Sequence, residues 1–144
     1  MRIYKVACKN EDELKEHIHD ALLEYIKNVD KGWNYVTPEE LHGKEDKYFL
    51  LDIRDKDSYK EGHIKGTKNI FWQDVLKEEN IKKLPKDKTI LLICYVGHTA
   101  SQLLMALSLL GYKVKALKFG MGRSPVKGVP VAGWLDYGYE VEGD

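Results

Sequence analysis

The sequence has few cysteines, no excess of either charge and no long apolar run. Cys8 and Cys94 are the two cysteines among 144 residues, too few for a disulfide framework. Lys+Arg and Asp+Glu each total 23, so no charged field indicates a nucleic-acid partner. No apolar run approaches a membrane span, and the amino terminus lacks the apolar core of a signal peptide. We therefore expect a cytoplasmic protein without a nucleic-acid or membrane partner.

The length and composition are those of one globular domain. A chain of 144 residues can bury a sizeable core, and 43% hydrophobic with 32% charged residues is ordinary for a soluble protein. We expect a single domain over residues 1–144, without internal repeats or linkers.

Short apolar segments alternate along the chain with segments of helical spacing. Largely apolar runs at residues 48–53 and 90–93 are typical of strands buried on both faces. Shorter strands are predicted at residues 34–36, 67–70 and 113–119. Helices are predicted within residues 10–29, 37–41, 71–84 and 100–110, with a partly helical connection at 54–62. Strands that alternate with helices imply crossover connections, so we expect an α/β fold with a parallel sheet flanked by helices.

The stretch around Cys94 is the most informative one. The strand at residues 90–93 leads into a short loop that begins at Cys94, and a helix follows, capped by Thr99 or Ser101 and stopped by Gly111. The first turn of a helix carries unpaired N–H groups and partial positive charge, so the loop can form an anion-binding cradle. A thiol there ionises more readily than a free one. The alternative is a core cysteine that simply ends a buried strand.

Two side chains are candidates beside this loop. Arg54 follows the strand at residues 48–53 and reaches the same sheet edge, either to bind substrate or to brace loops by pairing with Asp52. His98 lies in the loop, where a positive charge favours a thiolate, or projects into solvent. The spacing of the five histidines predicts no metal site.

The glycine-rich segment at residues 120–133 is predicted to be a loop near the same edge. Its cations, Arg123 and Lys127, either attract an anionic substrate or are solvated. A short helix at residues 134–137 and an extended piece at 139–142 are predicted to follow it.

Two separated motifs resemble the rhodanese-like sulfurtransferases. The first runs from Asp52-Ile53-Arg54 through Gly62-His63-Ile64 to Asn69-Ile70, in the order typical of that family. The second is the Cys94-Tyr95-Val96-Gly97 loop before a helix. The resemblance extends over residues 34–142 and leaves residues 1–32 as an N-terminal helical extension.

The resemblance implies a rhodanese-like fold and a double-displacement reaction. Cys94 takes sulfane sulfur from thiosulfate or a persulfide, becomes a persulfide, and passes the sulfur to cyanide or a thiol. Substrate binding falls to the backbone amides of the loop, with Arg54 and Arg123 as further candidates; the loop residues are Tyr95, Val96, Gly97, His98 and Thr99. The expected partners are a small anionic donor, a thiophilic acceptor and, as one possibility, a sulfur-relay protein. No cofactor is implied.

The sequence departs from the family pattern, so other functions remain as alternatives. Many members carry an arginine five places after the cysteine, where this chain has Thr99. A phosphatase or arsenate reductase needs an arginine one place later, where Ala100 stands, so that reading is disfavoured. A protein-partnered sulfur carrier or a non-catalytic interaction module are the remaining alternatives, although a module without catalysis has no need of Cys94.

Overall fold

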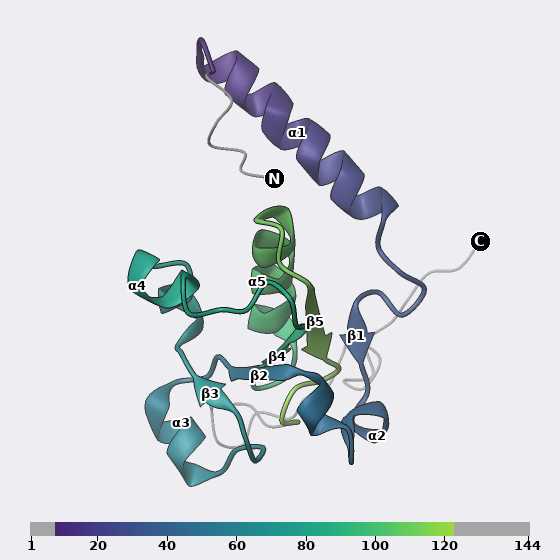
Figure 1. Ribbon diagram of the computed structural model, residues 1–144, viewed down its shortest axis with the longest axis vertical. Coiled ribbons are helices and arrows are strands. Elements are labelled where there is room, and N and C mark those ends of the chain that lie inside the picture. Colours follow the sequence, from purple (N-terminus) through teal and green to yellow (C-terminus); the bar gives the residue numbers. More distant parts are fainter. Residues whose placement is uncertain (1–7, 123–144) are drawn as a thin grey trace, which may run out of the picture.

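The computed structural model describes residues 8–122, which form a five-stranded parallel sheet with helices on both faces (Figure 1). The strand order is β1-β5-β4-β2-β3. This confirms the predicted α/β class and the parallel sheet. The strands are β1 (Tyr35–Val36), β2 (Phe49–Asp52), β3 (Lys68–Asn69), β4 (Ile90–Ile93) and β5 (Val114–Leu117).

Seven helical elements connect or precede the strands in the described part of the chain. The α-helices are α1 (Glu11–Lys27), α2 (Pro38–Leu41), α3 (Lys56–Glu61), α4 (Glu78–Ile81) and α5 (His98–Leu109). The short 3-10 helices are η2 (Glu45–Lys47) and η3 (Trp72–Asp74). None of the helices within residues 8–122 has the length and apolar character that crossing a membrane requires.

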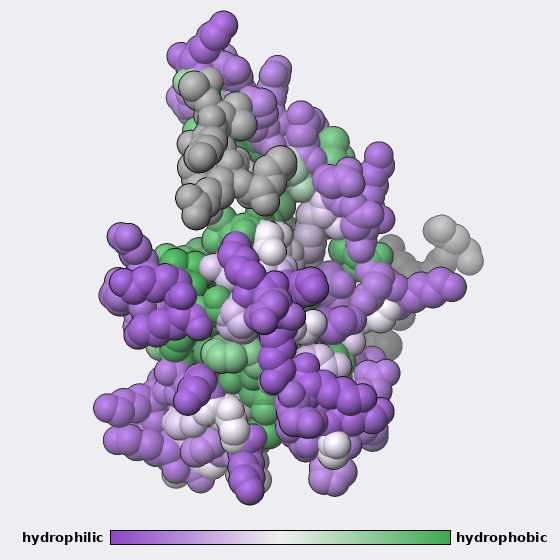
Figure 2. Space-filling model, in the orientation of Figure 1, coloured by the Kyte–Doolittle hydropathy of each residue, from purple (hydrophilic) through white to green (hydrophobic). Residues whose placement is uncertain are grey.

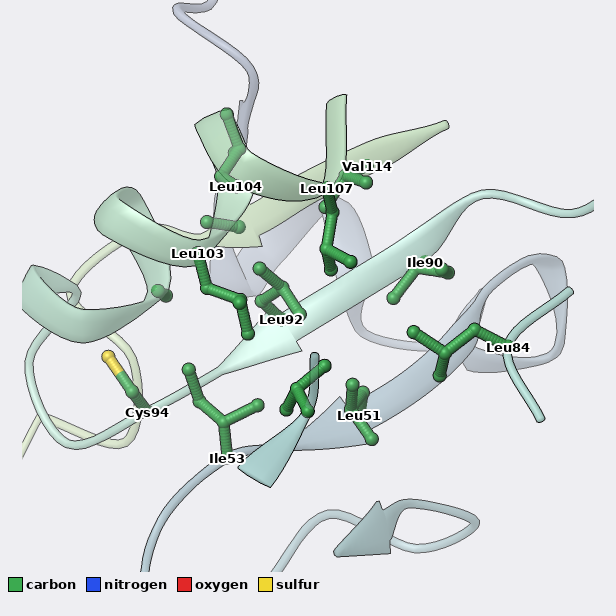
Figure 3. Packing of buried hydrophobic residues seen from close by; sticks show 13 residues of the cluster. Leu51, Ile53, Leu84, Ile90, Leu92, Cys94, Leu103, Leu104, Leu107 and Val114 are labelled. Atoms are coloured by element: carbon green, nitrogen blue, oxygen red, sulfur yellow. The ribbon is translucent and has the colours of Figure 1, made fainter. Parts of the chain in front are cut away.

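Strand β4 lies at the centre of the core, as its unbroken apolar run predicts. All four of its residues are buried, because both faces of the sheet are covered. Ile90 and Leu92 pack with Leu103 and Leu107 of α5 on one face (Figure 3). On the other face Leu91 and Ile93 pack with a second buried cluster, completed by Val36, Leu41, Leu50 and Leu117.

Helix α1 projects from the domain and packs against α5 through part of its apolar face (Figure 1). Asn10 caps it by accepting a hydrogen bond from the amide of Glu13. Tyr25 reaches the core beside α5, whereas Leu14, Ile18 and Ile26 are exposed. Hydrophilic residues cover most of α1 and the rim of the domain in this view, and hydrophobic residues emerge at the centre (Figure 2).

The predicted helix at residues 71–84 is wrong as a continuous element. The structure has η3 and α4 instead, with Val75 buried and Leu76 exposed between them. The backbone is extended at Lys77, with φ −60° and ψ 141°, and this interrupts the helical segment before α4 begins. The predicted helix at 134–137 and extended piece at 139–142 lie outside the described residues.

Shortening a side chain at the centre of α5 should destabilise the fold. Leu107 is fully buried, so Leu107→Ala should lower the free energy of unfolding by about 2–5 kcal/mol through lost transfer energy and a cavity. Met105→Ala on the exposed side of the same helix is the control and should change it by less than about 1 kcal/mol. Equal losses in urea unfolding would contradict this core.

Candidate functional site

Cys94 ends β4 at the carboxyl edge of the sheet, where its sulfur accepts a hydrogen bond from the backbone. The Gly97 amide donates to Cys94 Sγ with an N–S distance of 3.0 Å. The sulfur is directed toward the turn that begins α5, away from the leucines of the core (Figure 3). Cys94 is 1% exposed, as a core cysteine would be. The hydrogen bond is the feature that distinguishes it, because it places a backbone N–H donor at the sulfur.

The amino terminus of α5 has no side-chain cap, so the predicted capping by Thr99 or Ser101 is wrong. Gly97 is the N-cap residue, in the left-handed region at φ 99°. Ser101 faces the other way: its hydroxyl donates to the Gly97 carbonyl at 2.7 Å and lies 2.7 Å from the Tyr35 hydroxyl. The first amides of α5 are therefore not taken by a capping side chain, which leaves them available to an anion.

Tyr95 ties the Cys94 loop to the neighbouring strand β2. Its hydroxyl donates to the Asp55 carboxylate and accepts the Asp55 amide at 3.0 Å. The same carboxylate caps α3 by accepting the amides of Asp57 and Ser58 and the Ser58 hydroxyl. The hydrogen bonds from Ser58 and Tyr95 hold the pKa of Asp55 well below its usual value. Burial, with a further contribution from Asp55, raises the pKa of Tyr95, so its hydroxyl remains a donor.

The turn after β5 closes on the loop from the opposite side. The Met121 amide donates to the Cys94 carbonyl at 2.9 Å. Gly120 lies so close that a Cβ there would come within 2.9 Å of the Cys94 carbonyl carbon and closer still to its oxygen. Only glycine fits this position, which also has a φ of 53°.

Arg54 lies beside the loop, and its guanidinium is engaged in hydrogen bonds within the fold. Its Nη2 donates to the Asp52 carboxylate at 2.7 Å and to the Gly62 carbonyl at 2.7 Å. The side chains of Arg54 and Asp52 are both buried. The hydrogen bond with Asp52 raises the pKa of Arg54. Asn69 completes the brace by donating to the carbonyls of Asp52 and Arg54. These contacts explain the first motif structurally, and a contact between Arg54 and substrate stays a prediction.

The remaining predicted site residues fall into three groups. Val96 is half-buried in the loop, and His98 is exposed at the start of α5. The Thr99 hydroxyl oxygen is buried and has no hydrogen-bond partner among the described residues. Arg123 and Lys127 lie outside the described residues. Within residues 8–122 no cluster of His, Cys, Asp or Glu is arranged to hold a metal ion.

Sequence reasoning missed Asp55, Gly120 and Met121. Asp55 shows a local signal, since an Asp before a polar helical segment is a typical cap, but its partner Tyr95 is 40 positions away along the chain. Gly120 belongs to a predicted glycine-rich loop, whose contact with Cys94 depends on strands β4 and β5 lying side by side.

Removing the Tyr95 hydroxyl should weaken the fold in a pH-dependent way. Tyr95→Phe should cost about 1–2 kcal/mol at pH 7, because a hydrogen bond to a carboxylate is lost. A lowered carboxyl pKa stabilises the fold above its unfolded value, about 4, and this stability disappears as the pH falls through the lowered value. The difference between the two proteins should therefore shrink in acid.

Tyr59→Phe is the matched control for this experiment. The Tyr59 hydroxyl donates to the Thr67 carbonyl at 2.8 Å, and a carbonyl does not titrate. Its loss should be similar at pH 7 and at pH 3 in urea unfolding. A Tyr95→Phe loss that is equally constant with pH would contradict the Asp55 contact.

A methyl group at Gly120 should displace the Cys94 carbonyl. Gly122 also has a positive φ, 73°, but a Cβ there would meet nothing within 4 Å. Gly122→Ala should cost about 1 kcal/mol from backbone strain alone. Gly120→Ala adds a clash with backbone and should cost about 1–3 kcal/mol more. Equal losses in urea unfolding of the two variants would show that the turn does not press on the loop.

Comparisons with known proteins agree with this geometry. A tRNA sulfurtransferase of Pyrobaculum aerophilum is 28% identical over 110 residues, which cover 74% of this chain and 22% of that protein. A rhodanese-related protein of Thermoplasma volcanium shares the fold with a TM-score of 0.56 and 23% identity, covering 74% of this chain and 94% of the other. A rhodanese-like domain protein of Staphylococcus aureus shares the fold with a TM-score of 0.56 and 19% identity. The match covers 69% of this chain and 98% of that protein.

The chain thus spans about a fifth of the length of the curated relative, and the two solved structures support the fold alone. The model of the rhodanese-like domain matches residues 37–123, from the cap of α2 to just beyond the turn that closes on Cys94. With more than half of the chain matched, and with the expected sheet and cysteine loop in place, the chain belongs to the rhodanese-like domain family.

Proposed function

We propose that this chain is a sulfurtransferase that carries sulfane sulfur on Cys94. The observation that carries the proposal is the hydrogen bond from the Gly97 amide to Cys94 Sγ at the uncapped start of α5. Family membership and the similarity to a tRNA sulfurtransferase support sulfur transfer in general. Thiosulfate or a persulfide as donor, and cyanide or a thiol as acceptor, are the finer parts of the proposal.

The first half-reaction loads the cysteine. The Cys94 thiolate attacks the outer sulfur of thiosulfate, a new S–S bond forms, and the old S–S bond breaks with its electron pair leaving on sulfite. The total charge of thiolate plus thiosulfate equals that of persulfide plus sulfite, so no further reactant is needed. Cyanide or a thiolate then attacks the terminal sulfur and returns the Cys94 thiolate.

The loop supplies hydrogen-bond donors for the anionic sulfur. The Gly97 amide donates to Sγ, and no capping side chain occupies the first amides of α5. The buried Thr99 hydroxyl has no hydrogen-bond partner among the described residues, which supports its role as a further donor to substrate. Tyr95 contributes by positioning, since its hydroxyl is used by Asp55.

The relative suggests a second candidate acceptor. Because the similar region is a part of a much longer tRNA sulfurtransferase, a sulfur-relay partner protein is the alternative to a small thiol. No cofactor is needed for either version of the reaction. A cytoplasmic location stays a prediction from the sequence.

Replacement of Cys94 should abolish sulfur loading. Wild-type protein incubated with thiosulfate should gain the mass of one sulfur atom, and cyanide should remove it. Cys94→Ser should gain none, because an alcohol is not ionised and cannot form the persulfide. Cys8→Ser is the matched control and should load like the wild type, since Cys8 precedes α1 and lies outside the loop. Loading that is lost with Cys8 instead would overturn the assignment.

A further inference from the structure

Tyr35 is the first residue of β1, and it precedes residues 37–123, the part of the chain that the family model matches. Strand β1 is at one edge of the sheet, and β5 separates it from β4. Successive side chains of a strand point to opposite faces of the sheet. Val36 therefore packs with Leu91 and Ile93, whereas Tyr35 packs on the other face, against the cluster that includes Leu104 of α5.

A chain of hydroxyl groups leads from Tyr35 to the Cys94 loop, and its direction follows from the acceptor at its end. The Tyr35 hydroxyl lies 2.7 Å from the Ser101 hydroxyl. The Ser101 hydroxyl donates its one proton to the Gly97 carbonyl at 2.7 Å, because a carbonyl oxygen can only accept. The proton between the two hydroxyls must then belong to Tyr35. In this hydroxyl chain Tyr35 donates to Ser101, and Ser101 donates to Gly97.

The hydroxyl chain ends on the residue that donates to the reactive sulfur. The Gly97 amide donates to Cys94 Sγ at 3.0 Å, and the Gly97 carbonyl accepts both the hydroxyl and the amide of Ser101. Glycine has no side chain to restrict its backbone. Hydrogen bonds at the amide and at the carbonyl therefore hold Gly97 in the left-handed conformation, φ 99°, from which its amide reaches the sulfur.

The backbone on both sides of Tyr35 is itself fixed. The Tyr35 amide donates to the Gly32 carbonyl at 3.0 Å, and the Asn34 carbonyl accepts the amide of Ala116 in β5 at 2.9 Å. The Asp30 carboxylate accepts the Asn34 amide at 2.9 Å and pairs with Lys115 at 2.8 Å. The connection between α1 and β1 thus holds the Tyr35 hydroxyl in a defined place beside α5.

We propose that Tyr35 is a positioning residue for the Cys94 loop, which it fixes through Ser101 and Gly97. The proposal rests on the sulfur transfer proposed above and adds to it a residue from outside the matched region. Hydrogen bonds in a chain polarise one another, so the Tyr35 hydroxyl strengthens the bond from Ser101 to the Gly97 carbonyl. With that carbonyl fixed, the Gly97 amide stays directed at the sulfur during the attack on the donor.

The test measures the second-order rate constant for sulfur loading from thiosulfate, by intact mass, on full-length protein whose fold is checked by circular dichroism. Tyr35→Phe removes only the hydroxyl and should lower this constant about fivefold, the effect of one lost hydrogen bond. Ser101→Ala removes both links and should lower it about tenfold. The double variant should be no slower than Ser101→Ala, because Tyr35 acts through Ser101. Ser101→Thr keeps a hydroxyl that can reach the Gly97 carbonyl and should load within about twofold of wild type.

Tyr112→Phe is the matched control. Tyr112 is a second half-buried tyrosine against the same core cluster, and its hydroxyl donates to the Ile81 carbonyl at 3.2 Å. This variant should load sulfur like the wild type. Amide NMR gives a readout that does not depend on sulfur. The His98 amide belongs to the same peptide group as the Gly97 carbonyl, so its chemical shift should change in Tyr35→Phe and stay constant in Tyr112→Phe.

The outcomes separate this proposal from the one on which it rests. A Tyr35→Phe protein that loads sulfur at the wild-type rate overturns the positioning role and leaves sulfur transfer intact. A double variant whose loss is the product of the two single losses overturns it as well, since the two hydroxyls would then act independently. A wild type that gains no sulfur contradicts sulfur transfer. The His98 amide then decides on the hydroxyl chain alone, and an unchanged chemical shift in Tyr35→Phe overturns it.

Discussion

The hydrogen bond from the Gly97 amide to the Cys94 sulfur is the contact on which the site depends. It forms because the chain turns back on itself between β4 and α5, and that turn needs the left-handed conformation of Gly97. The same residue is the N-cap of α5, so no capping side chain competes for the amides of the first turn. One glycine thereby links the end of the central strand, the start of the helix and the position of the sulfur.

This turn is held by three contacts, two of which join residues far apart in the sequence. Tyr95 binds Asp55 on the β2 side, Met121 binds the Cys94 carbonyl on the β5 side, and Ser101 holds the Gly97 carbonyl from within α5. The parallel register brings the ends of β2, β4 and β5 to one edge, so each brace reaches its target with a short loop. A cradle of backbone amides works as an anion site only when it is held rigidly in this way.

Much of the fold could be predicted because its signals are local. The apolar run of β4 and the helical spacing of α5 each depend on residues close together in the sequence, and both are confirmed. The helix predicted at 71–84 is wrong because the backbone is extended at Lys77, a break that the apolar spacing does not show. The predicted cap of α5 by Ser101 is wrong because Ser101 lies inside the first turn, where its hydroxyl donates to the Gly97 carbonyl instead of accepting from an amide.

The position of Cys94 could be predicted from the strand and helix around it, whereas the contacts that hold its loop in place could not. The contact between Gly120 and Cys94, and that between Tyr95 and Asp55, depend on which strands are neighbours. Phe119 has a φ of 60°, in the left-handed region, and this could not be predicted either, because no local feature requires an aromatic residue to adopt a positive φ. These non-local features are the ones that distinguish this site from a core cysteine.

We propose that the loop amides hold a persulfide on Cys94. Amide chemical shifts of the ¹⁵N-labelled protein, followed by NMR during thiosulfate loading and cyanide removal, test it most directly. We expect the amide chemical shifts of Gly97, His98 and Thr99 to change when sulfur is added and to return to their original values when it is removed. Unmoved loop resonances in a protein that has gained sulfur, with shifts around Cys8 instead, would contradict it.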